Sequence, residues 1–139
     1  MTHSAVEYLL DTNIVSYYLR RSSANLETKL NTALRLGQCA VSVITRAELR
    51  YGHAAMVTED KRRPLIDGFL LRVPNLPWTA AAADHFGALK SRLKHEGTPI
   101  GEMDTQIGAH AVAEGLILVT HNTRHFERIP DLKLEDWMV

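Results

Sequence analysis

Apolar residues follow two spacings along this chain, and the two alternate from one end to the other. Short runs of aliphatic and β-branched residues predict strands over 6–10, 39–45, 73–78, 116–120 and 132–137, the last at a sheet edge. Apolar residues three and four positions apart predict helices over 14–19, 25–36, 46–56, 59–71, 79–95 and 102–114, with a short helical turn over 122–129. Alternating strands and helices indicate an α/β fold with a central parallel sheet, a three-layer α/β/α sandwich.

Composition and charge narrow the class of protein. The 139 residues suit one domain, predicted to span 1–139, and are enough to bury a hydrophobic core. Sixteen Lys and Arg balance sixteen Asp and Glu, so a polyanion has to meet a local cluster of basic residues. The single Cys39 excludes an intrachain disulfide and is typical of a reducing compartment. No apolar run approaches the ~20 residues of a membrane span. The N-terminal stretch differs from a signal peptide because Glu7 interrupts its apolar residues. We therefore expect a cytoplasmic protein without membrane contact.

Three acidic residues lie where strands and helices are predicted to meet. Asp11 follows the first strand, Glu48 lies early in the helix after the second, and Asp104 lies in the first turn of the helix 102–114. Each has a structural explanation by itself. Asp11 suits a helix N-cap, Glu48 stands three residues after Thr45 in the spacing of a capping box, and Asp104 is favoured there by the helix dipole.

Together with Asn122, which follows the strand 116–120, these acids would converge on one sheet edge if the strands are neighbours. Two carboxylates ~4 Å apart at an effective dielectric constant of ~20 repel by about 4 kcal/mol. Three such groups must bind protons, spread apart or hold a cation. Oxygen ligands suit Mg²⁺ or Mn²⁺, which keep waters and recruit phosphates. The pattern therefore indicates metal-dependent hydrolysis of a phosphodiester.

Other candidate groups have competing explanations. His121 and His125 have the spacing of a zinc-binding pair but lack a third ligand, so solvated or RNA-facing histidines are the preferred interpretation. Met56, Met103 and the aromatic residues are interpreted as core. The basic run 61–63 is interpreted as a solvated helix face. A phosphate-binding rim is indicated by the arginines near the proposed edge, namely Arg20, Arg21, Arg46, Arg50, Arg124 and Arg128.

Five segments in order, "LLDTN", "SVITRAELRYG", "GTPIGEMD", "LVTHNTRHFERI" and "LKLEDW", resemble the PIN-domain ribonucleases. The likeness covers essentially the whole chain and is greatest to the VapC toxins of bacterial toxin–antitoxin pairs. The resemblance implies an α/β/α sandwich and a Mg²⁺- or Mn²⁺-dependent endoribonuclease that cleaves structured RNA, notably tRNA or rRNA loops, leaving a 5′-phosphate and a 3′-hydroxyl. It also implies a homodimer and a cognate VapB-type antitoxin, which inhibits by placing a C-terminal segment in the acidic pocket.

The resemblance also assigns roles to individual residues. Asp11 and Asp104 match the positions of direct metal ligands. Glu48 would hold a second ion or a metal-bound water, and Thr12 or Asn122 would orient water. The acidic set is smaller than in many relatives, because Asn122 often corresponds to Asp in the wider family, so RNA phosphates are expected to complete the metal's coordination shell.

Three further residues concern the binding of substrate and the number of carboxylates in the site. Arg46 and Arg124 are the candidate substrate-orienting arginines. His125 stands where relatives with "NTREFER" have Glu, which removes another carboxylate from the site.

Two other functions and one surface remain open on the sequence. A non-catalytic RNA- or partner-binding module would retain the fold without cleavage, and a metal-dependent phosphatase would act on small phosphoesters. The residues Tyr17, Tyr18, Leu26 and Leu30 either line an antitoxin groove or belong to the core.

Overall fold

The computed structural model describes residues 5–139, so residues 1–4, the start of the stretch compared with a signal peptide, lie outside it. Within the described residues, five parallel strands form one sheet in the order β3-β2-β1-β4-β5. They are β1 (Tyr8–Leu10), β2 (Cys39–Ser42), β3 (Asn75–Leu76), β4 (Ile117–Val119) and β5 (Leu134–Glu135). The predicted edge strand is confirmed as β5.

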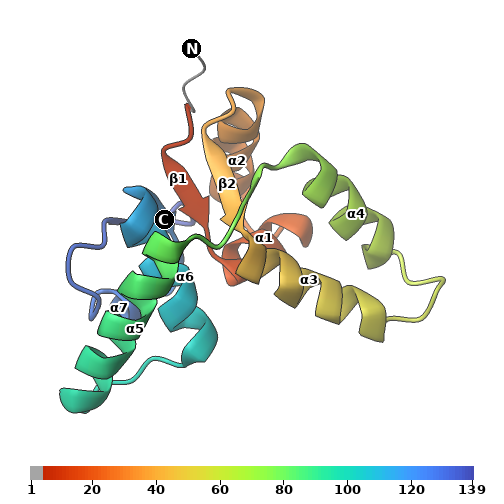
Figure 1. Cartoon of the computed structure of the whole chain (residues 1–139). Helices are drawn as coiled ribbons and strands as arrows, with labels where there is room; N and C mark the ends of the chain where they lie inside the picture. Colours follow the sequence, from red (N-terminus) through yellow and green to blue (C-terminus); the bar gives the residue numbers. More distant parts are fainter. Residues whose placement is uncertain (1–4) are drawn as a thin grey trace.

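Helices cover both faces of this sheet in the part of the chain that is described (Figure 1). One apolar cluster joins it to α1 (Thr12–Leu19), α2 (Ala24–Arg35), α3 (Val43–Ala55) and α4 (Arg62–Arg72). The other joins it to α5 (Ala80–His95), α6 (Glu102–Glu114) and α7 (Thr123–Phe126). The predicted three-layer α/β/α sandwich with a parallel sheet is confirmed.

Alternation along the strands explains the two clusters. Leu9 and Leu10 are both fully buried, yet Leu9 packs with α5 and α6 whereas Leu10 packs with α1 and α2. Leu118 and Val119 divide in the same way. Successive side chains of a strand point to opposite faces, so a strand covered on both sides reads as a continuous apolar run.

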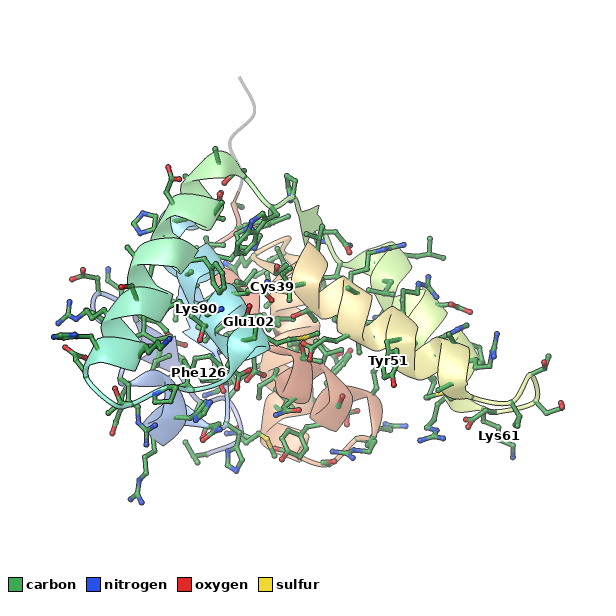
Figure 2. The ribbon with its side chains drawn as sticks, turned by 60° about the horizontal axis from the view of Figure 1, so that its bottom comes forward. Cys39, Tyr51, Lys61, Lys90, Glu102 and Phe126 are labelled. Atoms are coloured by element: carbon green, nitrogen blue, oxygen red, sulfur yellow. The ribbon has the colours of Figure 1, made fainter. Side chains whose placement is uncertain are left out.

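Helices α3 and α4 form a projecting pair beside the sheet (Figure 1). A 2.6 Å ion pair between Arg50 and Asp67 joins them, and Arg63 donates to the Met56 carbonyl at 2.8 Å. Figure 2 shows Tyr51 on the outside of α3 and Lys61 at the tip of the pair. Tyr51 and Met103 are exposed, so their assignment to the core was wrong.

The structure also corrects the interpretation of the basic run 61–63 as a solvated helix face, and it decides between groove and core for the apolar residues of α1 and α2. Arg63 is not simply solvated, because it closes the α3–α4 turn. Leu26 and Leu30 are fully buried in the cluster under α2, whereas Tyr17 and Tyr18 are partly buried against it. Leu26 and Leu30 are therefore core residues and do not line a groove.

Helix α3 begins earlier than its residues suggest. Residues 43–45 are Val, Ile and Thr, which favour strands, but Ser42 ends β2 and its hydroxyl accepts the Ile44 N–H at 3.0 Å. Thr45 therefore lies inside the helix, and the predicted capping box between Thr45 and Glu48 is wrong. No helix in residues 5–139 is long and apolar enough to cross a membrane.

Two glycines with open space around them provide a matched test of the backbone. Gly115 ends α6 at φ +67°, and Gly52 lies within α3. Gly115→Ala should destabilise the protein by about 1–2 kcal/mol because L-residues avoid the left-handed region, whereas Gly52→Ala should stabilise it by up to about 1 kcal/mol through helix propensity. Urea unfolding measures both, and equal signs would contradict the helix end assigned at Gly115.

Candidate active site

The strand order predicts a ligand-binding site at the carboxyl end of β1, where the side chains of the crevice described below meet. The connections from β1 lead to β2 and β3 on one side, while β4 and β5 lie on the other. In open α/β sheets the crevice opens where the strand order reverses. Asp11 follows β1 and Thr120 follows β4, and β1 pairs with both β2 and β4, so the condition under which the acids would converge is met.

Asp11 is held tightly at this point. Its Oδ1 accepts the Ile14 N–H at 2.7 Å, which caps α1, and its Oδ2 accepts the Thr120 hydroxyl at 2.6 Å. The residue is only 3% exposed. Burial raises the pKa of Asp11 to about 6, the bonds from Thr120 and Ile14 oppose this, and the charges of Asp104 and Glu48 add to it. Asp104 and Glu48 thus both act electrostatically on Asp11.

Glu48 reaches the crevice from the second turn of α3. The Thr12 hydroxyl donates to Glu48 Oε1 at 2.5 Å and lies 3.0 Å from the Thr45 hydroxyl. Since the Thr12 hydroxyl has one hydrogen, Thr45 donates to Thr12 and Thr12 to Glu48. The chain Thr45–Thr12–Glu48 joins the start of α1 to α3 beside Asp11.

Asp104 enters from the first turn of α6, which Lys90 of α5 braces through a 2.9 Å ion pair with Glu102 (Figure 2). The Asp104 side chain is 41% exposed and its Oδ2 lies 2.9 Å from Nε2 of His125. The same nitrogen lies 2.8 Å from the Ile100 carbonyl. Both partners are acceptors, so Nε2 carries the hydrogen. His125 therefore orients Asp104.

The remaining predicted site residues come from α7 and α3. Asn122 is exposed at the start of α7, and its backbone N–H donates to the Thr120 hydroxyl at 3.0 Å. Arg124 is exposed on α7. Arg46 instead donates to the Asn75 side chain at 3.2 Å, on the β3 side of the sheet. The structure does not bring the two arginines into one cluster.

His121 and His125 do not form a zinc-binding pair. His121 Nδ1 lies 2.8 Å from Asp136, whereas His125 binds Asp104. Across residues 5–139, no three His, Cys, Asp or Glu side chains lie close enough to enclose a metal ion. The donors at the carboxyl end of β1 still fit a hard divalent cation, because they are carboxylate oxygens, and burial together with the charges of Asp104 and Glu48 raises the pKa of Asp11. They form an open set, which suits an ion that keeps part of its water.

A buried pair that sequence reasoning missed connects α6 to α3. His110 is fully buried on α6, and its Nδ1 lies 2.8 Å from the hydroxyl of Ser42, the cap of α3. Burial lowers the pKa of His110, which keeps the imidazole neutral. Thr120 was missed as well, although a Thr directly after the strand next to Asp11 is a signal that the sequence contains.

Ser42→Ala should destabilise the protein by about 2 kcal/mol, because it removes a helix cap and leaves a buried imidazole nitrogen without its partner. Ser23 is the matched control, since its hydroxyl caps α2 by accepting the Leu26 N–H at 3.1 Å and makes no other polar contact within the described residues. Ser23→Ala should cost only about 1 kcal/mol. Equal losses in thermal unfolding would mean that the bond to His110 contributes nothing.

Comparison with known proteins decides the family. The PIN domain model matches residues 8–132. The chain belongs to the PIN-domain family. It is 37% identical over 132 residues to the tRNA(fMet)-specific endonuclease VapC of Shigella flexneri, covering 95% of this chain and 98% of that protein. It is 41% identical over 133 residues to ribonuclease VapC2 of Haemophilus influenzae, covering 96% and 99%.

A solved structure supports the same relationship. The crystal structure of VapBC2 from Rickettsia felis, bound to a DNA fragment from its promoter, contains a chain with a TM-score of 0.86 to this one. That chain is 33% identical, and the alignment covers 95% of this PIN-domain protein and 99% of the solved chain. PIN-domain nucleases in general depend on divalent metal ions, in agreement with the oxygen donors at the crevice.

Proposed function

We propose that this PIN-domain protein is a VapC-type endoribonuclease toxin that requires Mg²⁺ or Mn²⁺ and acts in the cytoplasm, with its whole length, 1–139, forming one PIN domain. The observation that carries the proposal is Asp11, a buried carboxylate at the switch point of the sheet whose pKa is raised to about 6 beside two further acids. An ionised carboxylate that is buried and lies near two other acids costs stability unless a cation is bound. Together with the VapC relatives, this supports metal-dependent cleavage of RNA.

The residues of the crevice have different tasks in the proposed reaction. Asp11 and Asp104 would hold the ion directly, and Glu48 would bind its water or a second ion. Thr12 holds Glu48 in place, and Asn122 would orient water from the rim. When bound, the ion supplies a more acidic water and stabilises charge on the leaving oxygen. The products would carry a 5′-phosphate and a 3′-hydroxyl.

The substrate is proposed to be structured RNA, with tRNA first and rRNA loops second. The Shigella relative is named for tRNA(fMet), which favours tRNA. Arg124 is exposed beside Asn122 and would contact a phosphate. Arg46 is joined to Asn75, so it would have to leave that partner to reach the RNA.

The proposed protein partners are a second copy of this chain and a VapB-type antitoxin. The Rickettsia structure is a VapBC2 complex on DNA, which supports an antitoxin partner and a toxin–antitoxin hetero-oligomer here. An antitoxin segment that entered the crevice would compete with RNA for the acids and for the bound ion.

Purified protein, shown to be free of antitoxin, should cut total bacterial RNA into discrete fragments in Mg²⁺ and leave it intact in EDTA. Mapping of the fragment ends identifies the RNA and checks the 5′-phosphate. Turnover of a chromogenic phosphate monoester without RNA cleavage would instead favour the phosphatase. RNA binding without any cleavage would favour the binding module.

A further inference from the structure

One histidine beside the crevice is fixed in place but has no part in the mechanism above. His121 directly follows Thr120, whose hydroxyl binds Asp11. Its Nδ1 lies 2.8 Å from Oδ2 of Asp136, and the side chains of His121 and Asp136 are 46% and 13% exposed. Asp136 is itself held, because its Oδ1 accepts the Met138 N–H at 2.9 Å. A largely buried carboxylate therefore orients a half-exposed imidazole.

This contact determines what the imidazole can offer. The Asp136 carboxylate only accepts, so the hydrogen of His121 lies on Nδ1. Nε2 has no hydrogen-bond partner anywhere in residues 5–139 and remains available to a ligand.

His121 lies beside two residues of the α1 region, the aromatic Tyr17 and the basic Arg20. The Tyr17 ring meets the His121 ring edge-on, with centroids 6.0 Å apart. The guanidinium of exposed Arg20 lies over the Tyr17 ring, 5.2 Å from its centroid. We call Arg20, Tyr17 and His121 the His121 ledge. Tyr17 lies roughly 8 Å along the axis of α1 from Thr12. His121 directly follows Thr120, which binds Asp11, so the ledge is connected to the acids through both chain segments.

We propose that the His121 ledge binds a nucleotide of the RNA that flanks the scissile phosphate, and that Asp136 is the positioning residue for His121. Aromatic rings and cations side by side are the means by which proteins hold single-stranded nucleic acid. In a chain of zero net charge, a polyanion needs such a local surface. The inference rests on the proposed function, since it places the ledge on the substrate of that site.

The test measures binding of fluorescently labelled bulk bacterial tRNA to the intact chain carrying Asp11→Asn, which we expect to prevent cleavage. His121→Ala should raise the Kd about tenfold and Asp136→Asn about threefold. Because Asp136 acts through His121, Asp136→Asn should add nothing in the His121→Ala background. His95→Ala is the control, since His95 is an exposed histidine at the end of α5, and it should leave the Kd unchanged.

Further readouts separate substrate binding from a structural role and from the proposed function. In the cleaving protein, His121→Ala should raise KM more than it lowers kcat, with an unchanged melting temperature. An unchanged Kd for tRNA would overturn the ledge, as would weaker antitoxin binding with intact tRNA binding. If the wild type cuts no RNA while tRNA binding still depends on His121, the proposed nuclease fails and the ledge stands.

Discussion

Asp11→Asn should lower RNA cleavage in Mg²⁺ by at least about a thousandfold, the order of magnitude lost with a principal electrostatic group in other hydrolases. The substitution preserves shape, since the Asn oxygen can still accept the Ile14 N–H and the amide can still meet the Thr120 hydroxyl. It removes the negative charge that we propose holds the ion. The rate of cleavage of bulk tRNA under single-turnover conditions measures the loss.

Asp84→Asn is the matched control for this experiment. Asp84 is an exposed aspartate of α5 outside the proposed active site, so its loss should leave cleavage within about twofold of wild type. Asp104→Asn should resemble Asp11→Asn in direction. Full activity of the Asp11→Asn protein would remove Asp11 from the metal site and return the binding module or an unforeseen catalytic group to consideration.

The same substitution should stabilise the metal-free protein at neutral pH by about 3 kcal/mol. The pKa of Asp11 rises from 3.8 to about 6 on folding, mainly through burial, and each pKa unit corresponds to about 1.4 kcal/mol. A group whose pKa is raised binds its proton more tightly in the folded state, so ionisation opposes folding. The wild type therefore loses this stability as the pH rises from about 4 to about 6, and the full cost remains above that window.

Urea unfolding in EDTA at several pH values measures the effect. The difference between Asp11→Asn and wild type should be near zero at pH 4 and reach its full value by pH 8, because Asn does not ionise. Added Mg²⁺ should stabilise the wild type at pH 8 and leave Asp11→Asn almost unchanged. A stability difference that does not vary with pH would contradict the raised pKa and the electrostatic argument for the cation.

Much of the fold could be predicted from the sequence, because the spacing of apolar residues along the chain matches the residues that are buried in the structure. The strand around Leu118 is a short apolar run buried on both faces, and Gly115 ends the preceding helix in the left-handed conformation that the stop signal requires. The positions of Asp11 and Asp104 relative to their helices were predicted correctly for the same reason. Each depends on a cap or a first turn, which neighbouring residues decide.

The start of α3 shows where local signals fail. Val43, Ile44 and Thr45 favour a strand, yet Ser42 caps the helix three residues before the predicted boundary. The helix forms here in spite of these strand-favouring residues because the Ser42 hydroxyl makes two hydrogen bonds, one with the Ile44 N–H and one with His110. His110 is 68 residues away in the chain, so no window of sequence contains that contact.

The sequence by itself determined the strand–helix alternation, the family and the acids Asp11, Glu48 and Asp104, since these depend on periodicity and on motifs read in order. Only the tertiary structure decided how those acids are held: Asp11 by Thr120, Glu48 by Thr12 and Asp104 by His125. It also decided that His121 faces Asp136 and that Arg46 faces Asn75. The physical reason is that strand order sets which distant side chains meet, and hydrogen bonds and burial then fix their charge and orientation.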